Sequence, residues 1–231
     1  MLNLHLIFLP MALGALAVLT LCLYKGEICP GQRGRLHRWL PVIIVPIVVA
    51  AGSVWLALSS LLLVVLTLIP AILIGVFCSK VKVGKTRDEG PRRLLQVAMG
   101  SGVVAWLATL MITGGHLWAL SVASFVVPGL SFAQALLLKA RSRLQSFHRI
   151  LPVAGVIGTM VMLVALLAEW SALANVDAHQ TVIFATLAGL VAACLTWVSH
   201  LFRSNAATLS QLVVVNGAIL VSLLAQLPLL S

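Results

Sequence analysis

The sequence predicts an all-α membrane protein: a polytopic bundle of eight transmembrane helices with both termini outside. Apolar residues (AVILMFWYC) make up 61% of the chain and charged residues only 9%, whereas a soluble domain carries about 25% charged residues. The mean hydropathy is +1.15. The apolar runs are long enough to cross a bilayer core about 30 Å thick, and the basic residues cluster in alternate loops. This composition excludes a soluble enzyme, a disordered chain and a secreted disulfide scaffold.

Eight apolar segments are expected to span the membrane. They are 3–24, 39–58, 60–79, 94–113, 117–138, 150–169, 181–201 and 208–229. The rest makes short loops, so residues 1–231 are expected to form a single transmembrane domain. A β-barrel is excluded because apolar and polar residues do not alternate. The first span is expected to be retained, because its positive charges follow it instead of preceding it.

The basic residues predict the orientation. The 15 Lys and Arg lie in loops 25–38, 80–93 and 139–149, with Arg203 between the last two spans. By the positive-inside rule these loops face the cytoplasm, which places both termini in the periplasm and the chain in the inner (plasma) membrane. An odd number of spans would scatter these charges over both faces. The basic loops are too short, and their basic residues too few, for nucleic-acid binding. They are expected either to contact anionic lipid or to dock a cytoplasmic partner.

Polar residues gather at the predicted exterior rim. Glu169 ends the sixth span, and His5 and Trp118 lie at the same predicted depth. One interpretation is an interfacial belt, in which Trp anchors the surface and the polar groups face water. The other is a shallow site for quinol, in which His or Glu accepts a proton and Trp lines an apolar slot. The candidate quinol-binding residues are His116, Glu169, Trp170, Asp177 and His179.

Other chemistry finds less support in the sequence. The six histidines show no metal-ligand spacing, and the cysteines Cys22, Cys29, Cys78 and Cys194 form no C-x-x-C pair. We therefore expect no metal, no catalytic residue and no tightly bound cofactor, with quinol or menaquinol as the ligand in question. The span interiors carry hydroxyl and amide side chains but no charge, whereas ion-coupled transporters usually place a charge there.

Two segments at the start of the chain resemble the membrane anchor subunit of dimethyl sulfoxide reductase-type molybdoenzymes. His5–Pro10 followed by Gly14-Ala15 resembles the start of that family, and Gln32–Trp39 is similar to its approach to the second span. A later stretch resembles its basic loop, sixth span and exterior segment; it runs through Arg149–Pro152, Ala168–Trp170 and His179-Gln180.

This resemblance implies a non-catalytic subunit of a respiratory oxidoreductase used in anaerobic electron transport. Such a subunit holds iron–sulfur and molybdoenzyme subunits and contacts quinol at the periplasmic face. The family's histidine-bearing loop between spans two and three is here reduced to Ser59-Ser60. The quinol residues of the family are therefore not carried over to this chain.

The size and loop spacing also resemble the lysoplasmalogenase-like eight-span hydrolases, which is the second choice. That resemblance implies a small lipid-modifying enzyme of the membrane. Its activity needs acids in Ser-Asp or Gly-Asp motifs, and the corresponding places read Gly75–Cys78 and Ala193–Thr196. A hydrolase without these carboxylates is expected to be inactive.

Overall fold

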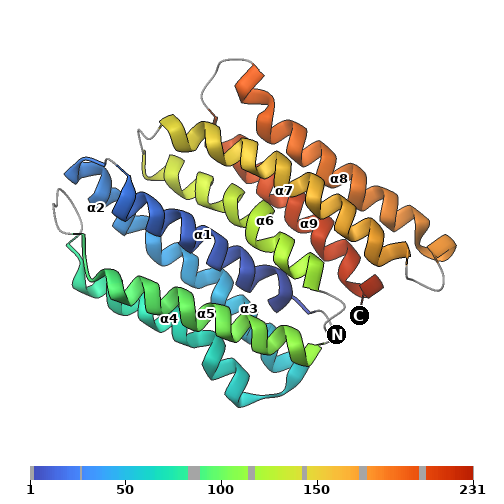
Figure 1. The fold of residues 1–231 in the computed structure, drawn as a ribbon, viewed down its shortest axis with the longest axis horizontal. Coiled ribbons are helices and arrows are strands. Elements are labelled where there is room, and N and C mark those ends of the chain that lie inside the picture. The colour runs from blue at the N-terminus through green and yellow to red at the C-terminus, as the bar shows by residue number, and fades with distance from the viewer. Residues whose placement is uncertain are drawn as a thin grey trace.

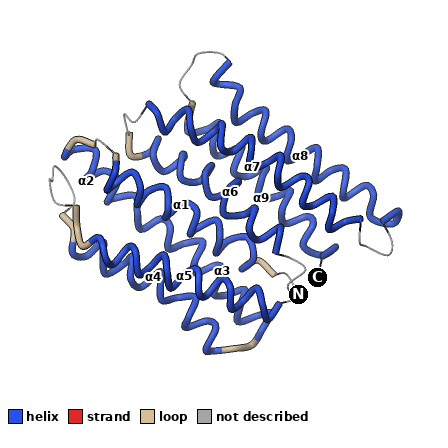
Figure 2. Tube along the Cα trace, in the orientation of Figure 1, coloured by secondary structure: helices blue, strands red, loops and turns tan. Residues whose placement is uncertain are grey.

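The computed structural model describes residues 3–26, 28–82, 89–113, 118–141, 145–171, 176–202 and 207–230, and these fold into packed helices (Figures 1 and 2). The helices are α1 (His5–Lys25), α2 (Pro30–Trp39), the 3-10 turn η1 (Leu40–Ile43), α3 (Ile44–Leu58), α4 (Leu61–Lys80), α5 (Arg92–Thr113), α6 (Trp118–Lys139), α7 (Gln145–Ser171), α8 (Val176–Phe202) and α9 (Leu209–Leu230). Within the described ranges, eight helical stretches are long and apolar enough to cross a membrane, with Pro30–Leu58 counted as one. The predicted fold class is confirmed.

The helices have two ends that differ in charge. Lys25, Lys80, Arg92 and Lys139 lie at one end, which we name the basic end. His5, Leu58, Thr113, Trp118, Ser171 and Leu230 lie at the other, which we name the terminal end because α1 begins and α9 finishes there. Which of these ends faces the cytoplasm stays a prediction.

The basic segment 25–38, expected as a loop, contains helix α2. Its start is favoured locally, because Pro30 occupies the first helical position and Cys29 and Gln32 form a reciprocal capping box. The backbone N–H of Cys29 donates to Gln32 Oε1 at 3.4 Å. The prediction of a loop was wrong because basic residues mark the boundary of the membrane whether the segment that carries them is a loop or a helix.

The predicted sixth and seventh spans, 150–169 and 181–201, agree with the membrane-crossing stretches Arg149–Ala168 and Gln180–Phe202, but the helices that contain them are longer. Helix α7 covers Gln145–Ser171 and α8 covers Val176–Phe202. Asp177 therefore lies in the first turn of a helix, although the sequence places it in a loop. Hydropathy marks only the part of a helix that crosses the apolar core, so helical turns beyond that core are missed.

The spans form two rings of four helices each. In the first ring α1 packs on α3, α3 on α4, α4 on α5 and α5 back on α1. In the second ring α6, α7, α8 and α9 close in the same order. Figure 1 shows the two rings side by side, with α1 and α6 between them. The two halves of the chain thus share one packing order, which no repeat in the sequence indicates.

Helices α1 and α6 form the seam between the rings. In their most apolar stretches 78% and 67% of the residues are buried, against 33–44% in the other spans. Two glycines allow the close approach: a Cβ on Gly129 would lie 3.0 Å from Cα of Gly14 and 3.3 Å from the carbonyl oxygen of Met11. Small residues at such crossings let membrane helices pack by van der Waals contact.

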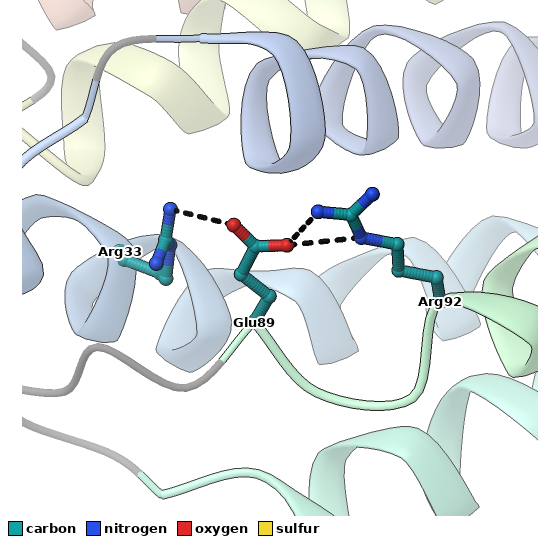
Figure 3. Close-up of polar contacts among 3 residues, drawn as sticks. All are labelled: Arg33, Glu89 and Arg92. Atoms are coloured by element: carbon teal, nitrogen blue, oxygen red, sulfur yellow. Dashed lines mark hydrogen bonds and ion pairs between the residues drawn. The ribbon is translucent and has the colours of Figure 1, made fainter.

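Helix α2 lies across the basic end and joins the two rings. Glu89, just before α5, accepts from Arg33 of α2 at 3.3 Å and from Nε of Arg92 at 2.9 Å (Figure 3). On its other side, Arg35 Nε donates to the carbonyl oxygen of Ala140, which follows α6, at 2.9 Å. Partly exposed ion pairs contribute little stability, so these contacts position α2 more than they stabilise the fold.

The seam generates a stability prediction. A Cβ on Gly14 would overlap the carbonyl oxygen of Phe125, so Gly14→Ala should lower stability by about 1–3 kcal/mol through overpacking. Thermal unfolding of the purified protein in detergent measures this loss. The matched control is Gly217→Ala, because no atom lies within 4 Å of a Cβ built there. Equal melting temperatures for both variants would contradict the close packing of α1 on α6 at Gly14.

The start of α2 generates a second prediction. The pKa of the exposed Cys29 thiol is lowered, mainly because the backbone N–H of Gln32 points at it, with smaller contributions from the N–H of Gly31 and from Arg35. Since the thiolate persists to lower pH, alkylation of Cys29 should stay fast at a lower pH than alkylation of a free cysteine. The rate is measured against pH after Cys22, Cys78 and Cys194 are replaced by Ala.

The same thiol tests the orientation. In intact cells, Cys29 should react only with membrane-permeant reagents, because the basic end is expected in the cytoplasm. The matched control is Ser171→Cys in the Cys29→Ala background, at the opposite end of the bundle. This thiol should react with impermeant reagents. The reverse pattern would overturn the predicted topology.

Candidate functional site

Of the predicted rim residues, Trp170 is the one whose side chain the structure describes. His116 lies outside the described residues, and the side chains of Glu169, Asp177 and His179 are also outside the description, although their backbones belong to α7 and α8. The predicted neighbourhood of the fifth and sixth spans is confirmed, since α6 packs on α7. The rim is therefore built here from Trp170 and the described side chains around it.

Trp170 is buried in the core of the second ring near the terminal end. Its side chain is 2% exposed and belongs to the same apolar cluster as Ile183 of α8 and Leu227 of α9. Its indole N–H has no hydrogen-bond partner among the described residues. A buried donor without a partner costs stability, so this position calls for a ligand, a water molecule or another protein group.

Two more side chains of the second ring share this property. Gln226 of α9 is 0% exposed, and neither its amide nitrogen nor its amide oxygen has a partner within the described part of the chain. Thr186 of α8 is also buried, and the same holds for its hydroxyl. Three helices of one ring thus present donors and acceptors that their described neighbours leave unused.

The helix register places these groups in the terminal half of the ring. Trp170 is one residue from the end of α7, and Gln226 is four residues from the end of α9. At about 1.5 Å per residue, Gln226 lies about 6 Å below the end of its helix. A Cβ on Gly189 of α8 would meet Ser222 of α9. Because α8 and α9 are antiparallel, Thr186 of α8 and Gln226 of α9 each lie about one helical turn nearer the terminal end than this contact.

The set matches an amphipathic ligand with both donor and acceptor groups. The indole of Trp170 only donates, the Gln226 amide donates and accepts, and the Thr186 hydroxyl does both. Leu166, Leu223 and Leu227 of the second ring belong to the same buried apolar cluster as Trp170. Binding sites in membrane bundles combine such an apolar lining with a few convergent polar groups. We name Trp170, Thr186 and Gln226 the upper polar group.

The terminal end of the first ring differs, because its buried polar atoms pair with one another. His5 Nε2 lies 3.0 Å from the Thr113 hydroxyl, and His5 Nδ1 lies 3.3 Å from the Ser53 hydroxyl. Thr113 donates its own proton to the carbonyl oxygen of Thr109 at 2.7 Å. It therefore accepts from His5, which fixes the proton of the imidazole on Nε2.

His5 was expected on the exposed rim, and that prediction was wrong. Its side chain is 0% exposed and ties α1 to α3 and α5. A second link lies nearby: Trp106 Nε1 donates to Ser121 Oγ at 2.6 Å, and Ser121 donates to the carbonyl oxygen of Leu6 at 3.0 Å. Buried polar groups of this kind need partners, so His5 serves the packing of the first ring.

The sequence missed Gln226 as a site residue and treated Thr186 as an ordinary polar residue of a span. The signal for Gln226 was present, because an amide interrupts the apolar run 218–230. An amide in a membrane span is costly unless it has a partner or a ligand. The sequence does not show which amide faces the core of a ring and lacks a partner, because that depends on how four helices pack.

The fold and the upper polar group define a class: a multi-pass membrane helix bundle, lying in the lipid bilayer, with a polar group inside one ring. A family model described as an integral membrane domain matches residues 6–231, and the chain belongs to this integral membrane family. No curated protein and no solved structure is significantly similar to the chain.

Proposed function

We propose that this chain is a non-catalytic membrane subunit of a molybdoenzyme-type oxidoreductase and binds quinol or menaquinol at its terminal end. The observations that carry the proposal are the unpartnered indole N–H of Trp170 and the unpartnered amide of Gln226, both near the terminal ends of their helices in the second ring. A quinone head group presents oxygens at both sides of one ring, so it accepts from an indole and exchanges hydrogen bonds with an amide. Its apolar tail suits the surrounding leucines.

The remaining candidate residues fit the same proposal by their place in the chain. Glu169 precedes Trp170 directly, and Asp177 and His179 lie on the first turn of the neighbouring helix α8. His116 lies two residues before the first residue of α6 in the sequence. Carboxylates and imidazoles at this rim would take up the quinol protons and release them to water.

The proposed partners supply the redox chemistry. An iron–sulfur subunit and a molybdoenzyme subunit would bind the chain and receive the electrons, because cofactors carry such chemistry and the protein supplies binding and orientation. On this proposal the membrane is the inner membrane, and the terminal end faces the periplasm.

The quinol site is tested by removing single hydrogen-bonding groups. Trp170→Phe keeps an aromatic ring and removes the indole N–H, and Gln226→Leu removes the amide. Each should weaken binding of a fluorescent quinol analogue by about fivefold, since one hydrogen bond contributes about 1 kcal/mol. The dissociation constant is measured by fluorescence titration of the purified protein in detergent.

The matched control is Trp118→Phe, because Trp118 lies at the same end of the bundle and is 60% exposed. This variant should bind the analogue as the unchanged protein does. Unchanged affinity in both Trp170→Phe and Gln226→Leu would refute the quinol site, provided that the variants keep their melting temperature.

The subunit role is tested by isolation from the native membrane in mild detergent. Mass spectrometry should find iron–sulfur and molybdoenzyme subunits in about equal amounts with this chain. Reversing two exposed charges of the basic end, with Arg38→Glu and Arg93→Glu, should lower the recovery of partners that dock there, once an unchanged orientation of the variant is verified. Recovery of the chain alone under conditions that preserve other membrane complexes would contradict the role.

A further inference from the structure

Unpartnered polar atoms continue through the second ring beyond the upper polar group. Two further buried side chains of this ring, Gln134 of α6 and His200 of α8, each carry a nitrogen without a partner among the described residues. Gln134 is five residues from the end of α6 and His200 is two residues from the end of α8. They therefore lie in the half of the ring nearer the basic end.

The hydrogen bonds of Gln134 define which of its atoms is unused. Trp197 Nε1 donates to Gln134 Oε1 at 2.6 Å, across the ring from α8 to α6. The oxygen is thus engaged, and the amide NH2 of Gln134 is left as a donor. The side chains of Gln134 and Trp197 are both 0% exposed, so this donor is not open to the outer surface of the bundle.

His200 offers the complementary atom. Its Nδ1 lies 2.7 Å from the carbonyl oxygen of Trp197 and donates to it, since a carbonyl only accepts. The proton of a neutral imidazole is then on Nδ1, and Nε2 is an unused acceptor. We name Gln134, Trp197 and His200 the lower polar group. It leaves one donor and one acceptor open, and buried polar groups left open in this way are commonly met by ordered water.

Polar side chains also lie between the two groups. Ser131 of α6 donates to Asn216 of α9 at 2.9 Å. Ser222, six residues further along α9, is buried next to Gly189 of α8. Six residues of helix correspond to about 9 Å, a distance that two or three water molecules bridge. Hydroxyl or amide groups thus occur at intervals along the ring, from Trp170 to His200.

We propose that the core of the second ring holds a file of buried water molecules along which protons pass between the terminal end and the basic end. The upper and lower polar groups would hold the two ends of this file, and Ser222, Ser131 and Asn216 would hold its middle. Each step moves a proton from one water or hydroxyl oxygen to the next. The water molecules and hydroxyls then rotate, which restores the original direction of the hydrogen bonds before the next proton passes. No oxidant or reductant takes part.

The chemistry of these groups favours protons over metal ions. Water, hydroxyls and an imidazole can pass a proton along hydrogen bonds, and the amides can orient the water by donating and accepting. A sodium or potassium ion needs several oxygen ligands or a counter-charge, and the described residues of this file include no carboxylate. We therefore expect proton conduction without potassium or sodium conduction.

The experiment uses the full chain in lipid vesicles loaded with a pH-sensitive dye. A potassium gradient and valinomycin set a membrane potential, and the change of internal pH reports proton flux without any quinol present. Vesicles with protein should acidify or alkalinise faster than protein-free vesicles. Equal rates in the two preparations would overturn the proposal.

Two variants locate the path. Thr186→Val removes one hydroxyl at nearly constant volume and should lower the flux by about tenfold, equivalent to about 1.4 kcal/mol on the barrier. The matched control is Thr67→Val in the first ring, where the buried hydroxyl donates to the carbonyl oxygen of Leu63 in its own helix. This control should leave the flux unchanged. A flux that is the same in Thr186→Val and Thr67→Val would refute the path through the second ring.

His200→Phe tests the lower group, because its loss removes the acceptor without breaking a bond between helices. It should reduce the flux and leave quinol-analogue affinity unchanged. The two proposals therefore fail separately: loss of quinol binding in Trp170→Phe does not depend on proton flux, and proton flux is measured in the absence of quinol.

Discussion

The close contact of α1 with α6 is the constraint on which the rest of the arrangement depends. Gly14 and Gly129 bring two backbones together where any larger side chain would separate them. In lipid, helices gain little from the hydrophobic effect, so their association rests on such packing and on hydrogen bonds. Each of the two central helices belongs to one ring, and the other six spans flank the seam.

Buried polar groups are met differently at the terminal ends of the two rings, whereas nearer the basic end α1 of the first ring also carries two hydroxyls, of Thr20 and Tyr24, without a partner among the described residues. At the terminal end of the first ring, His5, Ser53 and Thr113 satisfy one another and join three helices. In the second ring, side chains at both ends keep polar atoms that no described neighbour uses. Because an unsatisfied buried group costs about 1–3 kcal/mol, a ring that retains several of them is the reasonable place for a ligand or for water.

The basic end links the rings by a different means. Helix α2 carries Arg33 towards Glu89 and Arg35 towards the end of α6, while Lys139 lies over the Trp39 ring at 5.3 Å. The same basic residues that predict the orientation by the positive-inside rule thus also position α2 against both rings.

The sequence by itself determined the number of spans and the class of protein, because apolar length and charge are read residue by residue. It also predicted that the fifth and sixth spans are neighbours, whereas Trp170, expected at the exterior rim, is buried in the core. Only the tertiary structure decided that His5 is withdrawn into the first ring, that α2 is helical, and that Gln226 and Gln134 keep unused polar atoms. Whether a polar side chain is satisfied depends on partners from other helices, such as Thr113 for His5 across 108 residues of sequence, and the order of residues along one helix does not contain that information.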